Sequence, residues 1–278
     1  MTSVLIVEDN PANMLLTTAV LRRAGFDNLN LDLMFAIPGQ TLDIWRATLA
    51  EALTLGIEHL SSYEVIYEDD TPLFAQLRAG EFDVDEDLAC AMYEELVEGA
   101  TAAGFRQYEI ANFAKNKPLT RSRPSVTTLS PPSGEKVGVR GAIPFYACRH
   151  NVNYWRGGSY YGLGPSATSY VRGVRTKNWS NTQLYCEQLE KGQRAIESRE
   201  ELPPLRRAGE TAAFGLRMTT GWPFAEFRRV TGFDLREEWK TEMGQLTAHD
   251  WAAQDENHFQ LTSKGLRFAD AAAEMFLR

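Results

Sequence analysis

The amino-acid sequence predicts an α/β fold: a partial (β/α) barrel or open sheet of parallel strands, followed by a helical C-terminal domain. Two observations predict it. Between residues 28 and 114, short apolar segments typical of strands alternate with longer segments in which apolar residues recur at helical spacing. Beyond residue 199 the helical spacing dominates, and one short stretch has strand character. A chain of 278 residues is long enough for one large domain and a smaller one.

The composition predicts a soluble, cytoplasmic protein. Hydrophobic residues make up 44% of the chain, and no apolar run reaches the roughly 18 residues that suggest a membrane span. The first residues lack the basic and apolar regions of a secretory signal. The net charge of −8 argues against a general nucleic-acid-binding protein. Three widely spaced cysteines are typical of a reducing compartment.

Residues 1–25 have the pattern of a short strand followed by a helix, with Gly25 placed to end that helix. The stretch resembles the start of a response-regulator receiver domain, in which an acidic pair after the first strand helps to hold magnesium. Glu8 and Asp9 match that pair. The phosphoacceptor aspartate and the later lysine of a receiver are not found in their expected context. A solvated turn is therefore the preferred interpretation of the acidic pair.

The stretch from Asn28 to Thr41 is expected to contain a strand covered on both faces, because it is almost continuously apolar. Pro38 and Gly39 break this strand, and Thr41 is suited to cap the next helix. Asp32 interrupts the apolar run. Since a buried carboxylate is costly unless it is paired or binds a ligand, Asp32 is the first candidate functional residue.

The following segments continue the alternation of strands and helices. Helices are predicted over 43–56 and 83–104, and strands over 59–67 and 107–111. Because helices of this length separate the strands, the strands are expected to run parallel within a domain that spans 26–114.

Residues 115–147 differ in composition from the rest of the chain. Six Lys or Arg face a single Glu, and five of the twelve prolines lie here. A segment with so little apolar periodicity is predicted to be a disordered insert. A basic loop of this kind could contact nucleic acid or anionic lipid, but a solvated insert is favoured.

The last part of the chain divides into two segments. Residues 148–198, rich in aromatic residues and glycine, are expected to complete the barrel domain. No phosphate-loop spacing occurs here, so a hairpin with Tyr154, Trp155, Tyr160 and Tyr161 packed across its strands is preferred to a ligand-binding loop. Over 199–278 we expect a helix that starts at Pro203-Pro204, a second over 235–249, a two-stranded wing over 251–261 and a last helix. This order resembles a winged-helix domain. Acidic residues on the second helix disfavour DNA, so the module is expected to be structural.

A series of short motifs follows in a fixed order along the chain. They are Ala24-Gly-Phe, Asn30-Leu-Asp-Leu-Met, Pro38-Gly-Gln-Thr, His59-Leu-Ser-Ser-Tyr, Thr71-Pro-Leu, Tyr108-Glu-Ile-Ala-Asn-Phe-Ala, Cys148-Arg-His-Asn, Asn153-Tyr-Trp-Arg-Gly-Gly, Tyr161-Gly-Leu-Gly-Pro-Ser-Ala and Leu261-Thr-Ser-Lys-Gly-Leu. In this order they resemble the C-terminal two-thirds of the radical S-adenosylmethionine (SAM) heme chaperones, relatives of oxygen-independent coproporphyrinogen III oxidase.

The resemblance implies a partial (β/α) barrel, a 4Fe-4S cluster held by three cysteines, and SAM as a cofactor. Asp32 matches a family aspartate that contacts SAM, and Ile66 falls where the family lines the adenine; no contact is assigned to Gln40. For Asp32 the chemistry agrees, since a carboxylate at the carboxyl end of a parallel strand can accept both ribose hydroxyls. Its alternative is a buried acid bonded to backbone N–H groups. His150 is a candidate heme ligand because neutral imidazole binds iron strongly; its alternative is a packed or surface histidine.

The sequence also departs from the family pattern. The cluster motif Cys-x-x-x-Cys-x-x-Cys does not occur, and Cys90, Cys148 and Cys186 are too far apart in the chain to replace it by local spacing. The family's N-terminal third, with the cluster and the SAM-binding glycines, is expected to be replaced by the receiver-like residues 1–25. Radical catalysis is therefore not expected, and no catalytic residue or metal ligand is assigned.

The function implied by the resemblance is heme binding and delivery to an acceptor protein. The implied cofactors are SAM and heme, together with a 4Fe-4S cluster whose ligands are absent from the sequence. The implied partners are heme or porphyrin, a heme-acceptor protein and a second copy in a homodimer; nucleic acid and stable membrane insertion are not expected. Two alternatives stay open: a signalling fusion that keeps the receiver's acidic pair, and a recombinant or mis-assembled gene product without function.

Overall fold

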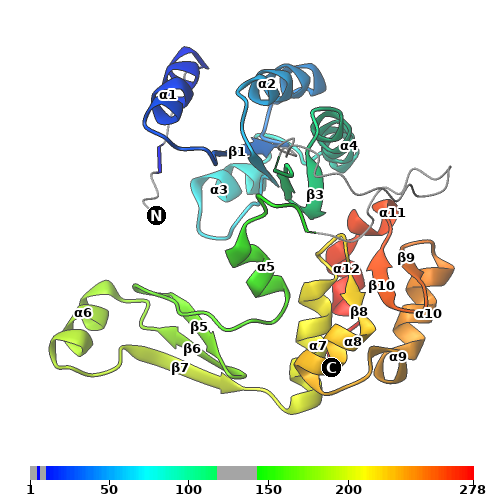
Figure 1. Cartoon of the computed structure of the whole chain (residues 1–278). Coiled ribbons are helices and arrows are strands. Elements are labelled where there is room, and N and C mark those ends of the chain that lie inside the picture. Colours follow the sequence, from blue (N-terminus) through cyan, green and yellow to red (C-terminus); the bar gives the residue numbers. More distant parts are fainter. Residues whose placement is uncertain (1–4, 7–10, 118–142) are drawn as a thin grey trace, which may run out of the picture. The chain divides into compact units, whose positions relative to one another are not determined.

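A computed structural model of the chain describes residues 5–6, 11–117 and 143–278 (Figure 1). The described chain divides into two compact units: unit 1 holds the residues up to 117 together with Pro144–Ala147, and unit 2 holds Ile143 and Cys148–Arg278. Glu8, Asp9 and most of the predicted insert lie outside the described residues. The receiver-like character of the first residues and the domain boundaries expected from the sequence stay predictions.

Unit 1 is a small sheet with helices between its strands. In chain order its elements are α1 (Pro11–Arg23), β1 (Asn30–Phe35), α2 (Leu42–Thr54), β2 (His59–Glu64), α3 (Pro72–Arg78), α4 (Glu86–Ala102), β3 (Arg106–Glu109) and β4 (Asn112–Ala114). The strands lie in the order β1-β2-β4-β3. Strands β1 and β2 are parallel, whereas β4 is antiparallel to both of its neighbours.

The expectation of a uniformly parallel layer is therefore wrong at β4. Only Ile110 and Ala111 separate β3 from β4, and a two-residue connection can join antiparallel strands but is far too short for a parallel crossover. The described strands of unit 1 form an open sheet, so the α/β class holds while the barrel itself stays a prediction.

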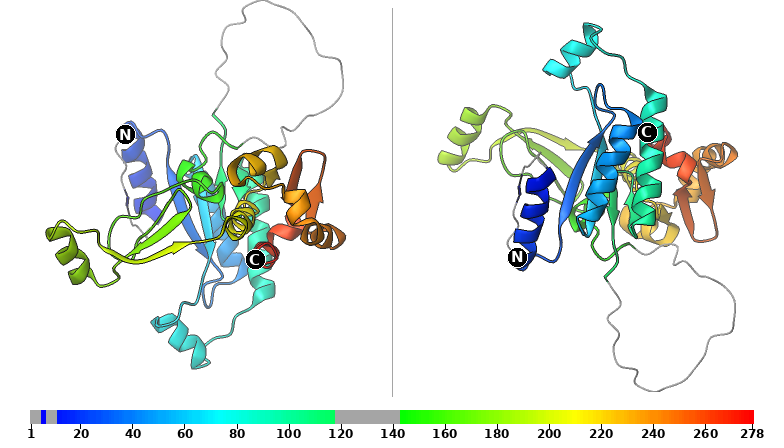
Figure 2. Two further views of the ribbon diagram at one scale, coloured as in Figure 1. Left: turned by 90° about the horizontal axis from the view of Figure 1, so that it is seen from below. Right: turned by 90° about the horizontal axis from the view of Figure 1, so that it is seen from above.

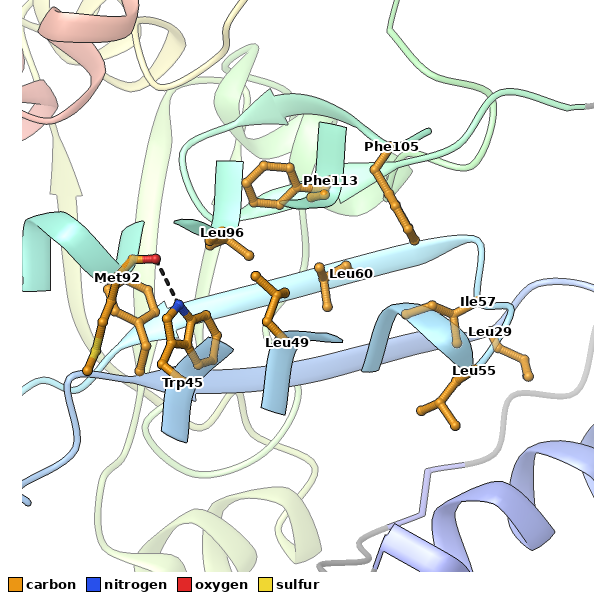
Figure 3. Close-up of a cluster of buried hydrophobic side chains, with 12 residues drawn as sticks. Leu29, Trp45, Leu49, Leu55, Ile57, Leu60, Met92, Leu96, Phe105 and Phe113 are labelled. Carbon is orange, nitrogen blue, oxygen red and sulfur yellow. Dashed lines mark hydrogen bonds between the residues drawn. The ribbon is translucent and has the colours of Figure 1, made fainter. Parts of the chain in front are cut away.

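Helices α2 and α4 cover one face of this sheet and lie side by side along it (Figure 2). Their apolar stripes, which include Trp45, Leu49, Met92 and Leu96, pack against buried residues of the strands such as Leu60 (Figure 3). The Trp45 indole Nε1 donates to the carbonyl oxygen of Met92 at 2.8 Å, which ties the two helices together inside the core. The hydrophobic effect of burying these side chains is what holds α2 and α4 to the sheet.

Strand β1 is buried on one face only, which corrects the expectation of a strand covered on both sides. Leu31, Leu33 and Phe35 belong to the core with the helices, while Asn30, Asp32 and Met34 alternate with them and are exposed. The Met34 side chain is 50% exposed although it is apolar. The apolar run thus contains the two-residue period of a half-buried strand.

Two predicted helix signals of unit 1 are confirmed. The Thr41 hydroxyl accepts the backbone N–H of Ile44 at 3.3 Å and caps α2. Gly25 adopts a φ of 91°, the left-handed conformation that ends a helix without strain only in glycine. In the last turn of α1, the Arg22 guanidinium contacts both carboxylate oxygens of Glu58 at 2.7 Å, and this ion pair fixes the end of α1 next to β2.

Unit 2 combines an antiparallel sheet with a helical region. Its elements are α5 (Arg149–Trp155), β5 (Thr168–Val171), β6 (Val174–Asn178), α6 (Thr182–Glu190), β7 (Ile196–Glu201), α7 (Pro204–Gly215), β8 (Trp222–Pro223), α8 (Phe224–Thr231), α9 (Leu235–Glu238), α10 (Lys240–Ala248), β9 (Ala252–Gln254), β10 (His258–Leu261), α11 (Ser263–Leu266) and α12 (Ala269–Glu274). The sheets have the orders β5-β6-β7 and β8-β10-β9. None of the helices in the described ranges combines the length and apolarity needed to cross a bilayer.

The beginning of unit 2 differs from the predicted aromatic hairpin. Residues 149–155 form helix α5, and the hairpin begins later, at β5. Tyr154 and Trp155 pack against Phe214 of α7, with ring centroids 5.6 and 6.2 Å away, rather than across strands. The two aromatic rings thus anchor α5 on the helical region of unit 2.

The C-terminal elements follow the predicted order, with one difference. Strands β9 and β10 form the predicted two-stranded wing, and β8 adds a third strand to it. The helix expected over 235–249 is divided at Trp239, whose backbone leaves the helical region at φ −121° and ψ 33°. The Trp239 indole is fully buried and donates to the carbonyl oxygen of Phe276 at 3.0 Å. This tertiary contact is formed at the position where the helix is interrupted.

Candidate functional site: a polar row across the sheet of unit 1

The face of the sheet opposite to α2 and α4 carries polar side chains in one row. Asp32 of β1 is paired with Ser61 of β2, Ser61 with Asn112 of β4, and Asn112 with Glu109 of β3. Residues paired across neighbouring strands project to the same face, so these four side chains share one side of the sheet. Ser61, Asn112 and Glu109 are 3%, 3% and 1% exposed. Polar groups buried to this extent need hydrogen-bond partners.

A chain of hydrogen bonds crosses the sheet beside this row. The Tyr108 hydroxyl lies 2.8 Å from Nε2 of His59, and Nδ1 of the same imidazole lies 2.6 Å from Oδ1 of Asn30. The amide nitrogen of Asn30 donates to Oδ1 of Asp32 at 2.8 Å. The Ser61 hydroxyl also donates to Asn30 Oδ1, at 3.2 Å. Side chains from three strands are thus joined to the carboxylate of Asp32.

The environment keeps the imidazole of His59 neutral. Burial lowers the pKa of His59 to about 4, while the negative charge of Asp32 acts in the opposite direction. The lowered pKa of His59 is consistent with its contacts. A buried imidazolium would have a phenol and an amide, rather than a carboxylate, at hydrogen-bond distance.

An irregularity in β3 brings Tyr108 into this series of hydrogen bonds. The pairing register shifts between Gln107 and Glu109, so that Tyr108 is the extra residue of a β-bulge. A bulge redirects side chains, and here both Tyr108 and Glu109 reach the polar face. The Glu109 carboxylate accepts the amide of Asn112 and the backbone N–H of Ala111.

Three buried side-chain oxygens of unit 1 have no hydrogen-bond partner among the described residues. They are Oδ1 of Asn112, in the row itself, Oγ of Ser62, next to Ser61 on β2, and Oε1 of Gln40, in the turn that follows β1. A buried acceptor that stays unpaired costs about 1–3 kcal/mol. Each of these oxygens is therefore a position where a donor from water or a ligand would be stabilising.

The residues singled out in the sequence lie in both units. Asp32 is exposed on the polar face and bonded to a side chain, which corrects its expected burial and differs from the alternative of an acid held by backbone N–H groups. Ile66 follows the carboxyl end of β2, parallel to β1, and is 72% exposed. His150 is exposed in the first turn of α5, in unit 2. Asp32 is the third of the six residues of β1, which corrects its expected place at the carboxyl end of the strand, and Ile66 lies two residues beyond the end of β2.

Sequence reasoning assigned no role to Asn30, His59, Ser61, Tyr108 or Asn112. A signal was present, because polar residues occupy alternate positions at the start of both β1 and β2. Such alternation indicates a polar face, but it does not reveal which side chains of distant strands bond to one another.

The three cysteines are distributed over both units. Cys90 lies on α4, Cys148 precedes α5 and Cys186 lies on α6, and no disulfide joins them. Within the described ranges no group of three or more His, Cys, Asp or Glu is placed to hold a metal ion. The donor set of the chain therefore does not fit the 4Fe-4S group of radical SAM proteins.

Unit 2 contains a small cavity between α5, α7 and the β5–β6 hairpin. Tyr154, Tyr160, Arg175, Glu210 and Phe214 are among its lining residues, and its volume is about 20 Å³. That volume holds a water molecule but no porphyrin. His150 does not line this cavity, so an iron porphyrin bound to its imidazole would have to lie at the surface of the unit.

Comparisons with known proteins agree with the motifs. Residues 202–268 match the family model of the HemN C-terminal domain. The heme chaperone HemW of Lactococcus lactis is 26% identical over 258 residues, which cover 92% of this chain and 60% of the relative. HemW of Bacillus subtilis is 27% identical over 257 residues, with the same two coverages. The chain thus spans about 60% of the length of these curated relatives.

The fold is similar to a solved structure as well. Coproporphyrinogen III oxidase (HemN) from Escherichia coli, described as a radical SAM enzyme, has a TM-score of 0.69 to this chain. The match covers 97% of this chain and 59% of the enzyme, at 15% sequence identity, and therefore concerns the fold. The family model and the curated relatives thus make the chain similar in sequence to HemW and to the HemN C-terminal domain, and the solved structure makes it similar in fold to HemN.

Proposed function

We propose that this chain binds heme and passes it to an acceptor protein in the cytoplasm, as a heme chaperone without radical catalysis of its own. The similarity to proteins named heme chaperones over 92% of the chain carries this proposal. The wide spacing of the three cysteines in the sequence supports the loss of catalysis, because a 4Fe-4S cluster of this family needs three neighbouring thiolates. A second copy of the chain is a proposed partner.

His150 is the proposed heme ligand. Its imidazole is exposed in the first turn of α5, so that iron porphyrin can reach it without opening the core of unit 2. Neutral imidazole is among the strongest protein ligands of heme iron. Cys148 occupies the N-cap position of the same helix, and its Sγ donates to Oδ1 of Asn151 at 3.4 Å, which engages the thiol locally.

A titration with ferric heme, followed by the shift of the Soret band, tests this assignment. Wild-type protein should bind heme, and His150→Ala should weaken binding at least about tenfold, the equivalent of roughly 1.4 kcal/mol. His249→Ala is the matched control, since His249 is also exposed at a helix end in unit 2. Equal heme affinity in His150→Ala and wild type would refute the assignment. No heme binding by wild type would refute the chaperone function.

Asp32 and Ile66 are the proposed contacts of SAM. An exposed carboxylate can accept the two hydroxyls of a ribose, and an exposed isoleucine at the end of the next parallel strand offers apolar contact to a base. In the family, SAM supplies a carbon radical after cleavage by the reduced cluster, a step that this chain is not proposed to perform. Calorimetry with S-adenosylhomocysteine, a stable analogue, measures the binding; unaltered affinity in Asp32→Asn would contradict the role of Asp32.

A further inference from the structure

The four side chains that lead from Tyr108 to Asp32 can be bonded in only one direction. A carboxylate only accepts, so the amide group of Asn30 that faces Asp32 must be its N–H₂ end. The oxygen of Asn30 then faces His59 and accepts from Nδ1–H. In a neutral imidazole with a proton on Nδ1, the other nitrogen is an acceptor, and the Tyr108 hydroxyl must donate to it.

We propose that Tyr108 and His59 are positioning residues that act through Asn30 to hold Asp32 as a preoriented acceptor for a ligand with a vicinal diol. This inference rests on the proposed function, in which Asp32 receives the ribose of a nucleoside cofactor. It adds three residues on three strands to that site and gives each a defined donor or acceptor role. The low pKa of His59 agrees with the neutral imidazole that the direction requires.

The hydrogen bond from Asn30 gives the two carboxylate oxygens of Asp32 different roles. Oδ1 accepts from Asn30 at 2.8 Å, whereas Oδ2 makes no hydrogen bond to the described residues and lies on an exposed side chain. Holding one oxygen restricts rotation of the carboxylate, so that a hydroxyl meets the other oxygen without a further loss of side-chain entropy. Exposed carboxylates without such support lose that entropy when they bind a ligand.

Tyr108, at the far end of this series of hydrogen bonds, affects Asp32 because linked hydrogen bonds constrain one another. Without the hydroxyl of Tyr108, Nε2 of the buried His59 imidazole loses its donor. A buried acceptor without a donor costs about 1–3 kcal/mol, which favours rotation of the imidazole toward water. Such a rotation weakens the hydrogen bond from Nδ1–H to Asn30, and it loosens the amide that holds Oδ1 of Asp32.

Binding of S-adenosylhomocysteine, measured by calorimetry on the full chain, tests the positioning role. Asp32→Asn should lower the affinity by about tenfold or more, and Tyr108→Phe and His59→Gln by roughly three- to tenfold, in line with the loss of one or two hydrogen bonds. Tyr93→Phe is the matched control. The wild-type Tyr93 hydroxyl donates to the carbonyl oxygen of Ile110 at 3.2 Å and accepts from Gln107 at 2.6 Å. It lies in the same unit but is not part of the hydrogen bonds that lead from Tyr108 to Asp32. Tyr93→Phe should bind within about twofold of wild type.

Nitrogen NMR of the imidazole provides a readout that general destabilisation does not move. Wild-type His59 should give the signature of the neutral Nδ1–H tautomer, and in Tyr108→Phe the resonance of the unprotonated Nε2 should shift because that nitrogen no longer accepts a hydrogen bond. A wild-type Nε2–H tautomer overturns the proposed direction. Affinity lowered by Asp32→Asn but unaltered by both Tyr108→Phe and His59→Gln overturns the positioning role while leaving the nucleoside site intact. If wild type does not bind the analogue, the nucleoside site itself fails, and this inference fails with it.

Discussion

The buried imidazole of His59 should make unit 1 sensitive to mild acid. The pKa of His59 is about 4 in the folded protein, against an ordinary value of 6.5. Between these two values the unfolded chain binds a proton at His59 that the folded protein does not bind. The free energy of unfolding therefore has its full contribution from His59 above pH 6.5, and loses it progressively as the pH falls toward 4.

The size of the effect follows from the difference between the two pKa values. At about 1.4 kcal/mol per pKa unit, lowering the pH from about 7 to about 4.5 should reduce the free energy of unfolding of unit 1 by about 2–3 kcal/mol through His59 alone. This is a large part of the roughly 5–15 kcal/mol that stabilises an ordinary domain. Other groups titrate in the same range, so the effect is read as a difference between wild type and His59→Gln.

Unit 1 can be observed separately because Trp45 is its sole tryptophan in the sequence up to residue 147. In protein labelled with 5-fluorotryptophan, the fluorine resonance of Trp45 follows urea unfolding of unit 1 at each pH. His59→Gln should remove the extra loss of stability between pH 6.5 and 4, whereas the exposed control His249→Gln should keep it. Parallel pH profiles for wild type and His59→Gln would refute the buried neutral imidazole.

Three further predictions concern the stability of the two units. Leu96→Ala should destabilise unit 1 by about 2–5 kcal/mol because its fully buried side chain leaves a cavity between α4 and the sheet; the same fluorine resonance measures it, and a loss below 1 kcal/mol would contradict that packing. Gly215→Ala should lower the melting temperature of unit 2, since an added Cβ would lie 2.2 Å from the ring of Trp222, whereas Gly244→Ala meets no atom within 4 Å and should be neutral or stabilising. Equal melting temperatures for the two glycine variants would argue against the close packing of α7 on Trp222. Asp85→Ala removes the carboxylate that caps α4 and should cost about 1 kcal/mol, with faster amide exchange confined to the first turn of that helix.

Local signals in the sequence identified much of the architecture. Thr41 and Gly25 mark helix ends through their own side-chain and backbone chemistry, and the apolar stripe of α4 reports its buried face. The β9–β10 pair was likewise evident from a short stretch of sequence. These features depend on residues within about one turn or one hairpin of each other, so a single sequence is enough to predict them.

The sequence by itself determined that Asp32 stands out in an apolar strand, because a charge among leucines is conspicuous in any register. Only the tertiary structure decided what surrounds it. Asn30 and His59 are 29 residues apart, and His59 and Tyr108 are 49 residues apart. Their meeting depends on the parallel pairing of β1 with β2, the reversal at β4 and the bulge in β3. Strand register and bulges are set by the packing of the whole sheet on α2 and α4, and no local pattern of residues encodes them.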